Sequence, residues 1–135
     1  MISAIANQGQ LRFMVYKGAL RVNRFLTFLK RLIKDVKRKV FLIVDNLRVH
    51  HAKKVQEWVE INHKKIELFF LPAYTPERNP DEYLNQDVKS SLSNKKAPRN
   101  QIELTVNLRT YMRSLQKKSK KVKSFFQHNL VKYAA

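Results

Sequence analysis

Two acidic residues follow apolar segments at positions from which they could bind a metal ion. Asp45 comes directly after the apolar segment 40–44, and Glu82 follows the apolar segment 68–71 after a loop. Carboxylates are ligands that Mg²⁺ commonly takes in proteins, together with substrate phosphates. Two such ions can activate an attacking water or 3′-hydroxyl and stabilise the leaving oxygen. The pair would suit this chemistry if both carboxylates lie at one edge of a sheet.

The apolar segments before these acids are expected to be neighbouring parallel strands. Segment 40–44 has five consecutive apolar residues, three of them β-branched, which predicts a strand buried on both faces. Segment 66–71 predicts the next strand, and a helix from about His51 to Asn62 lies between the two. Open α/β sheets place their active sites at the carboxyl ends of such strands, which is where Asp45 would lie.

The first third of the chain predicts an antiparallel hairpin followed by a helix. Strands at 2–7 and 11–16 flank a turn at Gln8-Gly9. Asn23 is a suitable N-cap for a helix that runs through about Val36 and therefore includes Asp35. An antiparallel hairpin followed by parallel strands describes a mixed α/β sheet.

The last part of the chain is expected to be helical, in segments at about 81–93, 100–116 and 119–131. Apolar residues at helical spacing support the last two segments. These residues are Leu104, Leu108, Tyr111 and Leu115 in the first, and Val122, Phe125, Phe126 and Leu130 in the second.

The residues singled out for chemistry also have simpler interpretations. Asn79 as N-cap, Pro80 at the first helical position and Glu82 three residues after the cap would form a capping box. The sequence Asp45-Asn46 after a strand could be a turn. His50 and His51 could bind a metal, but no other His or Cys clusters with them, which favours a surface pair.

The charge of the chain points to a polyanionic partner. Lys and Arg number 28 against 10 Asp and Glu, which gives a formal net charge of +18. Phosphate neutralisation releases counterions and dominates affinity for nucleic acids, so DNA or RNA is the first inference. A ribosome-associated or merely basic surface is the alternative. The absence of cysteine excludes disulfides and thiolate metal sites, and no apolar run approaches membrane-spanning length.

Several basic residues are candidates for contact with DNA phosphates, although a solvated helix face is the usual explanation of such runs. The candidates are Lys53, Lys54, Arg78, Lys117, Lys118, Lys120, Lys121 and Lys123.

Two stretches, VDNLRVHHAKKV and LFFLPAYTPERNPDEYLNQDVKS, resemble the catalytic core of the DDE transposases of the mariner-like insertion-sequence superfamily. The matching features are Asp45-Asn46, a nearby His, the loop around Leu71-Pro72 and Tyr74-Thr75-Pro76, and Asn79-Pro80-Asp81-Glu82. The resemblance covers roughly residues 1–95. It implies a ribonuclease-H-like fold, Mg²⁺ or Mn²⁺, and DNA cleavage followed by strand transfer. It also makes Asp45 the second and Glu82 the third acid of the catalytic triad, and both of them metal ligands.

The sequence departs from that family before the hairpin, where the family has a central strand carrying the first acid. No carboxylate precedes Asp35 here, and the helix-turn-helix that reads transposon ends is absent. We therefore expect a ribonuclease-H-like mixed sheet with flanking helices that lacks its first central strand. Residues 1–95 would form the partial catalytic domain, and residues 96–135 a basic helical C-terminal extension.

The expected function is that of a transposase catalytic fragment, inactive alone because the first acid is missing. Its partners would be DNA (transposon ends and target), an upstream transposase half or an intact transposase, and a second copy of the chain. It would lie in the bacterial cytoplasm with the nucleoid, without membrane contact. The alternative is a non-catalytic basic DNA-binding remnant, or a regulator of an intact transposase.

Overall fold

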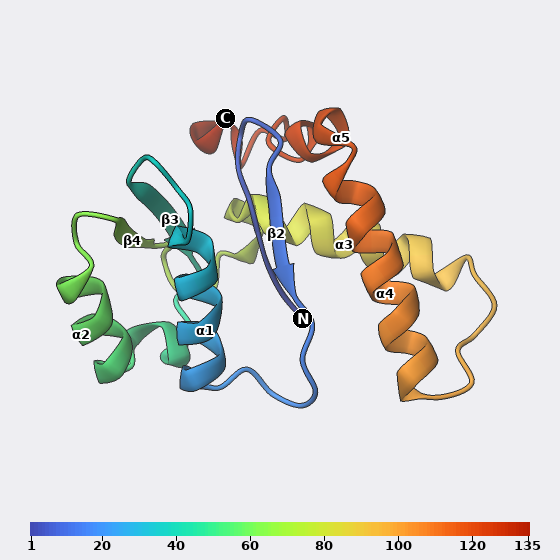
Figure 1. Ribbon diagram of the computed structural model, residues 1–135. Coiled ribbons are helices and arrows are strands. Elements are labelled where there is room, and N and C mark those ends of the chain that lie inside the picture. The colour runs from blue at the N-terminus through green and yellow to red at the C-terminus, as the bar shows by residue number, and fades with distance from the viewer. The chain divides into compact units, whose positions relative to one another are not determined.

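The computed structural model describes all of residues 1–135 and divides the chain into two units. Unit 1 combines residues 1–16 with residues 80–135, and unit 2 comprises residues 17–79. Each unit contains one two-stranded sheet and its own helices (Figure 1).

Unit 2 is built around the parallel pair of strands that the sequence predicts. β3 pairs with β4 in a register that runs from Val40 opposite Ile66 to Val44 opposite Phe70. The helix between them, α2, packs against β4, and α1 packs against α2. The elements are α1 (Val22–Ile33), β3 (Val40–Val44), the 3₁₀ helix η1 (Arg48–His51), α2 (Lys53–Ile61), β4 (Ile66–Phe70) and the 3₁₀ helix η2 (Pro76–Arg78).

The expectation that the first of these strands is buried on both faces is wrong. Val44 and Ile66 are buried, whereas the side chain of Phe41 is 62% exposed and that of Phe69 is 46% exposed. The rings of Phe41 and Phe69 lie 6.2 Å apart on the exposed face. In many proteins helices cover both faces of a parallel sheet. Here the face that carries Phe41 and Phe69 is exposed, although the residues of β3 are all apolar.

The boundaries of α1 also differ from the prediction. The N-cap is Arg21 in extended conformation, and the amide of Phe25 donates to its carbonyl at 3.0 Å, so Asn23 lies inside the first turn. The helix ends at Ile33, and Asp35 adopts a positive φ of 63° in the turn beyond it. Val36 therefore lies outside the helix and is exposed.

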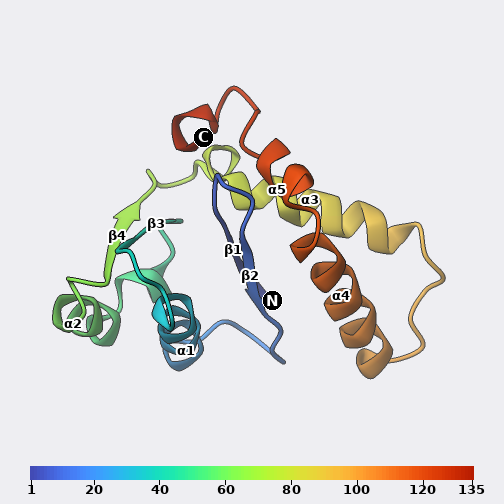
Figure 2. The same cartoon turned by 45° about the horizontal axis from the view of Figure 1, so that its top comes forward.

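Unit 1 packs the hairpin against two long helices. β1 contacts α3, and β2 contacts α4, as Figures 1 and 2 show. Buried residues from these elements form its core, with Leu84 and Met112 fully enclosed. The elements are β1 (Ile2–Ile5), β2 (Leu11–Met14), α3 (Pro80–Ser93), α4 (Gln101–Gln116), α5 (Ser119–Ser124) and the 3₁₀ helix η3 (Lys132–Ala134).

The end of the chain is less helical than expected. α5 stops at Ser124, so the helix predicted over 119–131 is half that length. Phe125 and Phe126 are still buried, but Leu130 is exposed and the neighbouring Val131 is buried instead. A helix continued to residue 131 would bury Leu130 with Phe126. Because the helix ends at Ser124, the chain beyond it turns and buries Val131 instead. In α4, Leu104 is exposed and Met112 takes the buried position.

The two short sheets, one antiparallel and one parallel, and the five helices give a mixed α/β fold. This arrangement is consistent with part of a ribonuclease-H-like fold, as the sequence predicts. No helix is long and apolar enough to cross a membrane.

The hairpin turn brings Gly9 into close contact with the start of α5. Gly9 has a φ of +97°, and a Cβ atom there would lie 2.7 Å from the Cβ of Ser119 and 2.8 Å from its carbonyl oxygen. Gly18 has a similar φ of +84°, but a Cβ atom there would meet nothing closer than Arg24 Nη1 at 3.8 Å. The two glycines therefore separate the cost of backbone conformation from the cost of a steric clash.

We predict that Gly9→Ala destabilises the protein more than Gly18→Ala does. Gly18→Ala should cost about 1–2 kcal/mol because an L-residue disfavours positive φ. Gly9→Ala should cost about 1–3 kcal/mol more because the added methyl group overpacks the contact with Ser119. Urea denaturation followed by circular dichroism measures both. Equal losses would mean that the hairpin turn does not pack against α5.

Candidate active site

Asp45 lies at the carboxyl end of β3, as its position after an apolar strand predicts. The ladder between β3 and β4 closes with the amide of Leu71 donating to the carbonyl of Val44 at 2.9 Å. Asp45 is the next residue and is partly buried. Its Oδ1 accepts a hydrogen bond of 2.8 Å from Nδ2 of Asn79, and Oδ2 does not take part in that bond.

The loop that contains Asn79 is stabilised by hydrogen bonds between its own residues. Thr75 Oγ1 donates to the carbonyl of Pro72 at 2.6 Å, and the amide of Asn79 donates to the carbonyl of Pro76 at 3.0 Å. Tyr74 has a positive φ of 58° and its side chain is 98% exposed. Pro72, Pro76 and Pro80 further restrict the backbone of this segment, because proline fixes φ.

His50 supports the same corner from inside unit 2, so the expectation of a surface pair of histidines is wrong for this residue. Its side chain is 6% exposed, and Nδ1 lies 2.7 Å from the main-chain carbonyl oxygen of Asp45. Since a carbonyl only accepts, the proton is on Nδ1. The ring also lies 4.5 Å from that of Phe25.

Burial lowers the pKa of His50, and this outweighs the hydrogen bond to Asp45 and the charge of that residue, which raise it. His50 is therefore neutral in the folded protein near neutral pH. His51 is exposed, stacks on Phe70 with ring centroids 4.1 Å apart, and lies within hydrogen-bonding distance of Asn46 Oδ1.

Glu82 lies in the first turn of α3, in unit 1, and is partly buried. The carboxylate of the preceding residue, Asp81, accepts from the single hydroxyl proton of Ser3, whose Oγ lies 2.7 Å from Oδ1 and 2.9 Å from Oδ2. Asp81 thus ties α3 to β1 within unit 1. Asp45 and Glu82 belong to different units, and their convergence stays a prediction.

The donor chemistry of Asp45 fits a hard divalent cation. Mg²⁺ takes carboxylate oxygens, and Asp45 presents one oxygen to Asn79 and has a second available for such a ligand role. Neither unit contains a group of three or more His, Asp or Glu side chains that could hold a metal ion by itself.

The basic residues predicted to contact DNA are spread over both units. All of them except Lys121 are exposed, namely Lys53, Lys54, Arg78, Lys117, Lys118, Lys120 and Lys123. Lys121 lies 3.2 Å from Asp87 Oδ1. Burial opposes its charged form, but hydrogen bonds to Asp87 and Tyr111 raise the pKa of Lys121 overall. Tyr111 itself donates to Asp87 and accepts from Ser91 Oγ at 2.9 Å.

Sequence reasoning missed the role of Asn79 as a partner of Asp45. The two residues are 34 positions apart, and the local pattern assigned Asn79 only to the cap of α3. The signal that could have found it is topological. Both residues follow strands that are paired in parallel, so both lie beyond the same end of the sheet.

The sequence model of the DDE superfamily endonuclease family matches residues 1–105, which is most of the chain and includes all of unit 2 and the part of unit 1 up to residue 105. The chain belongs to the DDE superfamily endonucleases. A comparison with curated proteins gave no match. Membership of this family indicates a function of the nuclease or transposase type, DNA as the substrate class and the general use of divalent metal ions.

We predict that unit 2 loses stability as the pH falls below the ordinary histidine pKa of 6.5. The pKa of His50 is lower in the folded than in the unfolded state, so the unfolded state takes up the proton first. The contribution of neutral His50 to the free energy of unfolding is complete above pH 6.5 and is lost as the pH falls through the pKa of His50 in the folded state. Fluorescence of Trp58, the one tryptophan, reports urea unfolding of unit 2.

The matched controls are His50→Gln and His51→Gln. The first should remove this pH dependence, and the second should retain it because His51 is exposed. A His50→Gln protein with the same loss of stability between pH 7 and pH 5 as the native chain would contradict the assignment to His50.

Proposed function

We propose that this chain supplies the second and third acids of a DDE transposase, Asp45 and Glu82, for metal-dependent DNA cleavage and strand transfer. The observation that carries the proposal is the hydrogen bond from Asn79 to Asp45. It joins the strand-end acid to the first residue of Asn79-Pro80-Asp81-Glu82, the segment that also contains Glu82. Two separate motif segments thus meet in a chain of the DDE endonuclease family.

Each side chain has a distinct role in this proposal. Asp45 and Glu82 bind Mg²⁺ or Mn²⁺ through carboxylate oxygens, and Asn79 orients Asp45 by donating to Oδ1. Bound ions would polarise a phosphodiester and activate the attacking water or 3′-hydroxyl. Asp81 is assigned a structural role instead, because its carboxylate bonds the Ser3 hydroxyl of β1.

The remaining carboxylate of the triad, its first acid, has no candidate near Asp45 and Glu82 in the sequence. Residues 1–34 contain no Asp or Glu, and Asp87, an acid near the motif, is engaged by Tyr111 and Lys121. We infer that an upstream transposase segment provides the first acid, so that residues 1–135 do not cleave DNA alone. The formal charge of +18 favours a second candidate, a protein that binds DNA without chemistry and competes with an intact transposase.

The proposal assigns the catalytic part to residues 1–95 and the basic extension to residues 96–135. Transposon ends and target DNA are the substrates. The exposed Lys53, Lys54 and Arg78, with the lysines around α5, contact DNA phosphates and provide the electrostatic part of the affinity.

We predict that Mn²⁺ binding weakens strongly in Asp45→Asn and in Glu82→Gln, but little in Asp81→Asn. Asn79→Ala should weaken it about 10–100-fold, the usual effect of losing an outer partner of a ligand. Calorimetric Mn²⁺ titration of residues 1–135 measures all four variants. A larger effect of Asp81→Asn than of Glu82→Gln would mean that the third acid is Asp81.

A nicking assay tests the inferred need for another acid. Residues 1–135 with Mg²⁺ or Mn²⁺ should leave supercoiled plasmid intact. Addition of the product of an adjoining upstream reading frame that carries a strand-borne Asp should give metal-dependent nicking, abolished by Asp45→Asn. Nicking by residues 1–135 alone that is lost in Asp45→Asn would place all the ligands within this chain.

A further inference from the structure

The end of unit 2 opposite Asp45 is strongly basic. β3 and β4 are parallel and begin side by side, with Val40 opposite Ile66 and the amide of Val40 donating to the carbonyl of Lys65 at 2.8 Å. The segments that precede the two strands therefore meet at this end. Both are rich in basic residues, which we call the amino-end basic surface: Lys37, Arg38, Lys39, Lys64 and Lys65.

These five residues are exposed, and most of their charge is not neutralised by acids of unit 2. Lys39 lies 3.2 Å from Glu67 and its ammonium is 5.5 Å from the ring centroid of Phe41. No ion pair or side-chain hydrogen bond involves the other four. Asp35 lies in the turn two positions before Lys37, and Glu67 lies two positions after Lys65.

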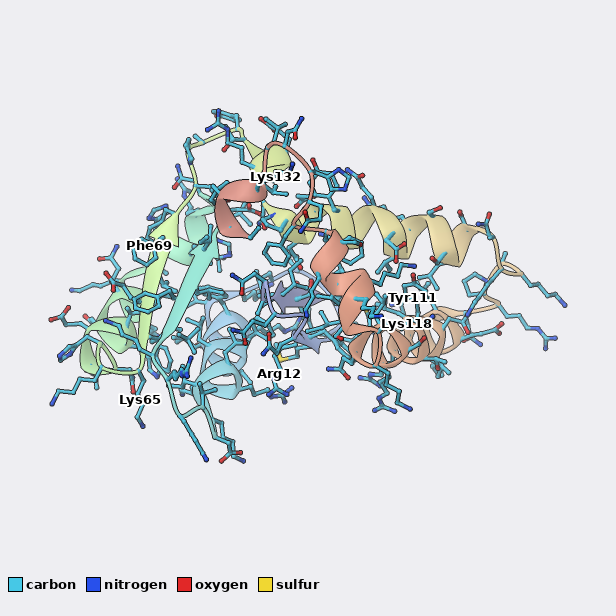
Figure 3. All side chains as sticks on the ribbon, turned by 90° about the horizontal axis from the view of Figure 1, so that it is seen from above. Arg12, Lys65, Phe69, Tyr111, Lys118 and Lys132 are labelled. Atoms are coloured by element: carbon cyan, nitrogen blue, oxygen red, sulfur yellow. The ribbon has the colours of Figure 1, made fainter.

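The surface is distinct in position from the candidate active site. β3 has five residues, so at a rise of about 3.3 Å per residue its first and last residues are separated by about 13 Å. Figure 3 shows Lys65 where β4 begins and Phe69 further along the same strand, towards its carboxyl end. That end of β4 is paired with the end of β3 that Asp45 follows. A phosphodiester at Asp45 cannot also contact Lys65.

We propose that the amino-end basic surface binds the phosphate backbone of duplex DNA that flanks the reacting phosphodiester. The charges come from two segments joined by backbone hydrogen bonds, so their spacing is held by the sheet rather than by flexible side chains alone. A separation of about 13 Å corresponds to about four base pairs at 3.4 Å per phosphate along one strand. The proposal rests on the proposed function, because it takes the duplex at Asp45 as its starting point.

The test compares two fourfold variants that remove the same charge. One replaces Lys37, Arg38, Lys64 and Lys65 with Gln, and the control replaces the exposed Lys89, Lys95, Lys96 and Arg99 of unit 1 with Gln. Affinity for a 30-base-pair duplex is measured over a range of salt concentrations. The first variant should lower affinity at least about tenfold at low salt and reduce the slope of log affinity against log salt by about three. The control should change the slope by less than one.

Two further measurements keep the outcomes separate. Trp58 fluorescence shows whether unit 2 of the variant unfolds at the same urea concentration as the native chain. Because the chain has no cysteine, Lys65→Cys accepts a single iron chelate, which should cut bound duplex DNA, whereas Lys95→Cys at one of the control positions of unit 1 should cut much less. Equal slopes in the two fourfold variants, or no cutting from position 65, would overturn the inference while leaving the active-site proposal intact. A native chain that binds no duplex at low salt would overturn both.

Discussion

The parallel pairing of β3 with β4 is the constraint on which unit 2 depends. A parallel register places the ends of both strands together, so it decides which loops are neighbours. At the carboxyl end it brings the loop after β4 to Asp45 and allows Asn79 to donate to that carboxylate. At the amino end it brings two lysine-rich segments together. One set of backbone hydrogen bonds thus separates the end that bears Asp45 from a basic end within 63 residues.

The corner around Asp45 is supported from both the solvent and the core sides. Asn79 fixes one carboxylate oxygen, and the buried His50 fixes the main-chain carbonyl of the same residue. A neutral imidazole suits this second position because it donates one proton without adding charge to a ring that lies against Phe25. The side chain and the backbone of Asp45 are therefore held by independent groups.

The strands, the parallel connection and the helix at α3 were predictable from apolar runs and from the segment Asn79-Pro80-Asp81-Glu82. The exposure of Phe41 was not predictable, because an apolar segment indicates that a strand can be buried but does not show whether other elements cover both of its faces. The early end of the last helix was missed for a related reason. Val122, Phe125 and Phe126 have helical spacing, yet Phe125 and Phe126 are buried from a turn that follows α5. The Asn79–Asp45 bond depends on tertiary contact over 34 positions, which local patterns do not encode.

Unit 1 is assembled from the two ends of the sequence, with unit 2 inserted between them. Gln116 donates to the carbonyl of Leu11 at 3.0 Å, a contact that spans 105 positions. On a ribosome, unit 2 is complete once residue 79 has emerged, whereas the hairpin of residues 1–16 must wait for α3 and α4 to be made. Contacts of such long sequence separation form slowly, and an unpaired hairpin exposes apolar surface in the meantime. All residues of unit 2, including Asp45, therefore leave the ribosome before the helices that must cover the hairpin, the first of which bears Glu82.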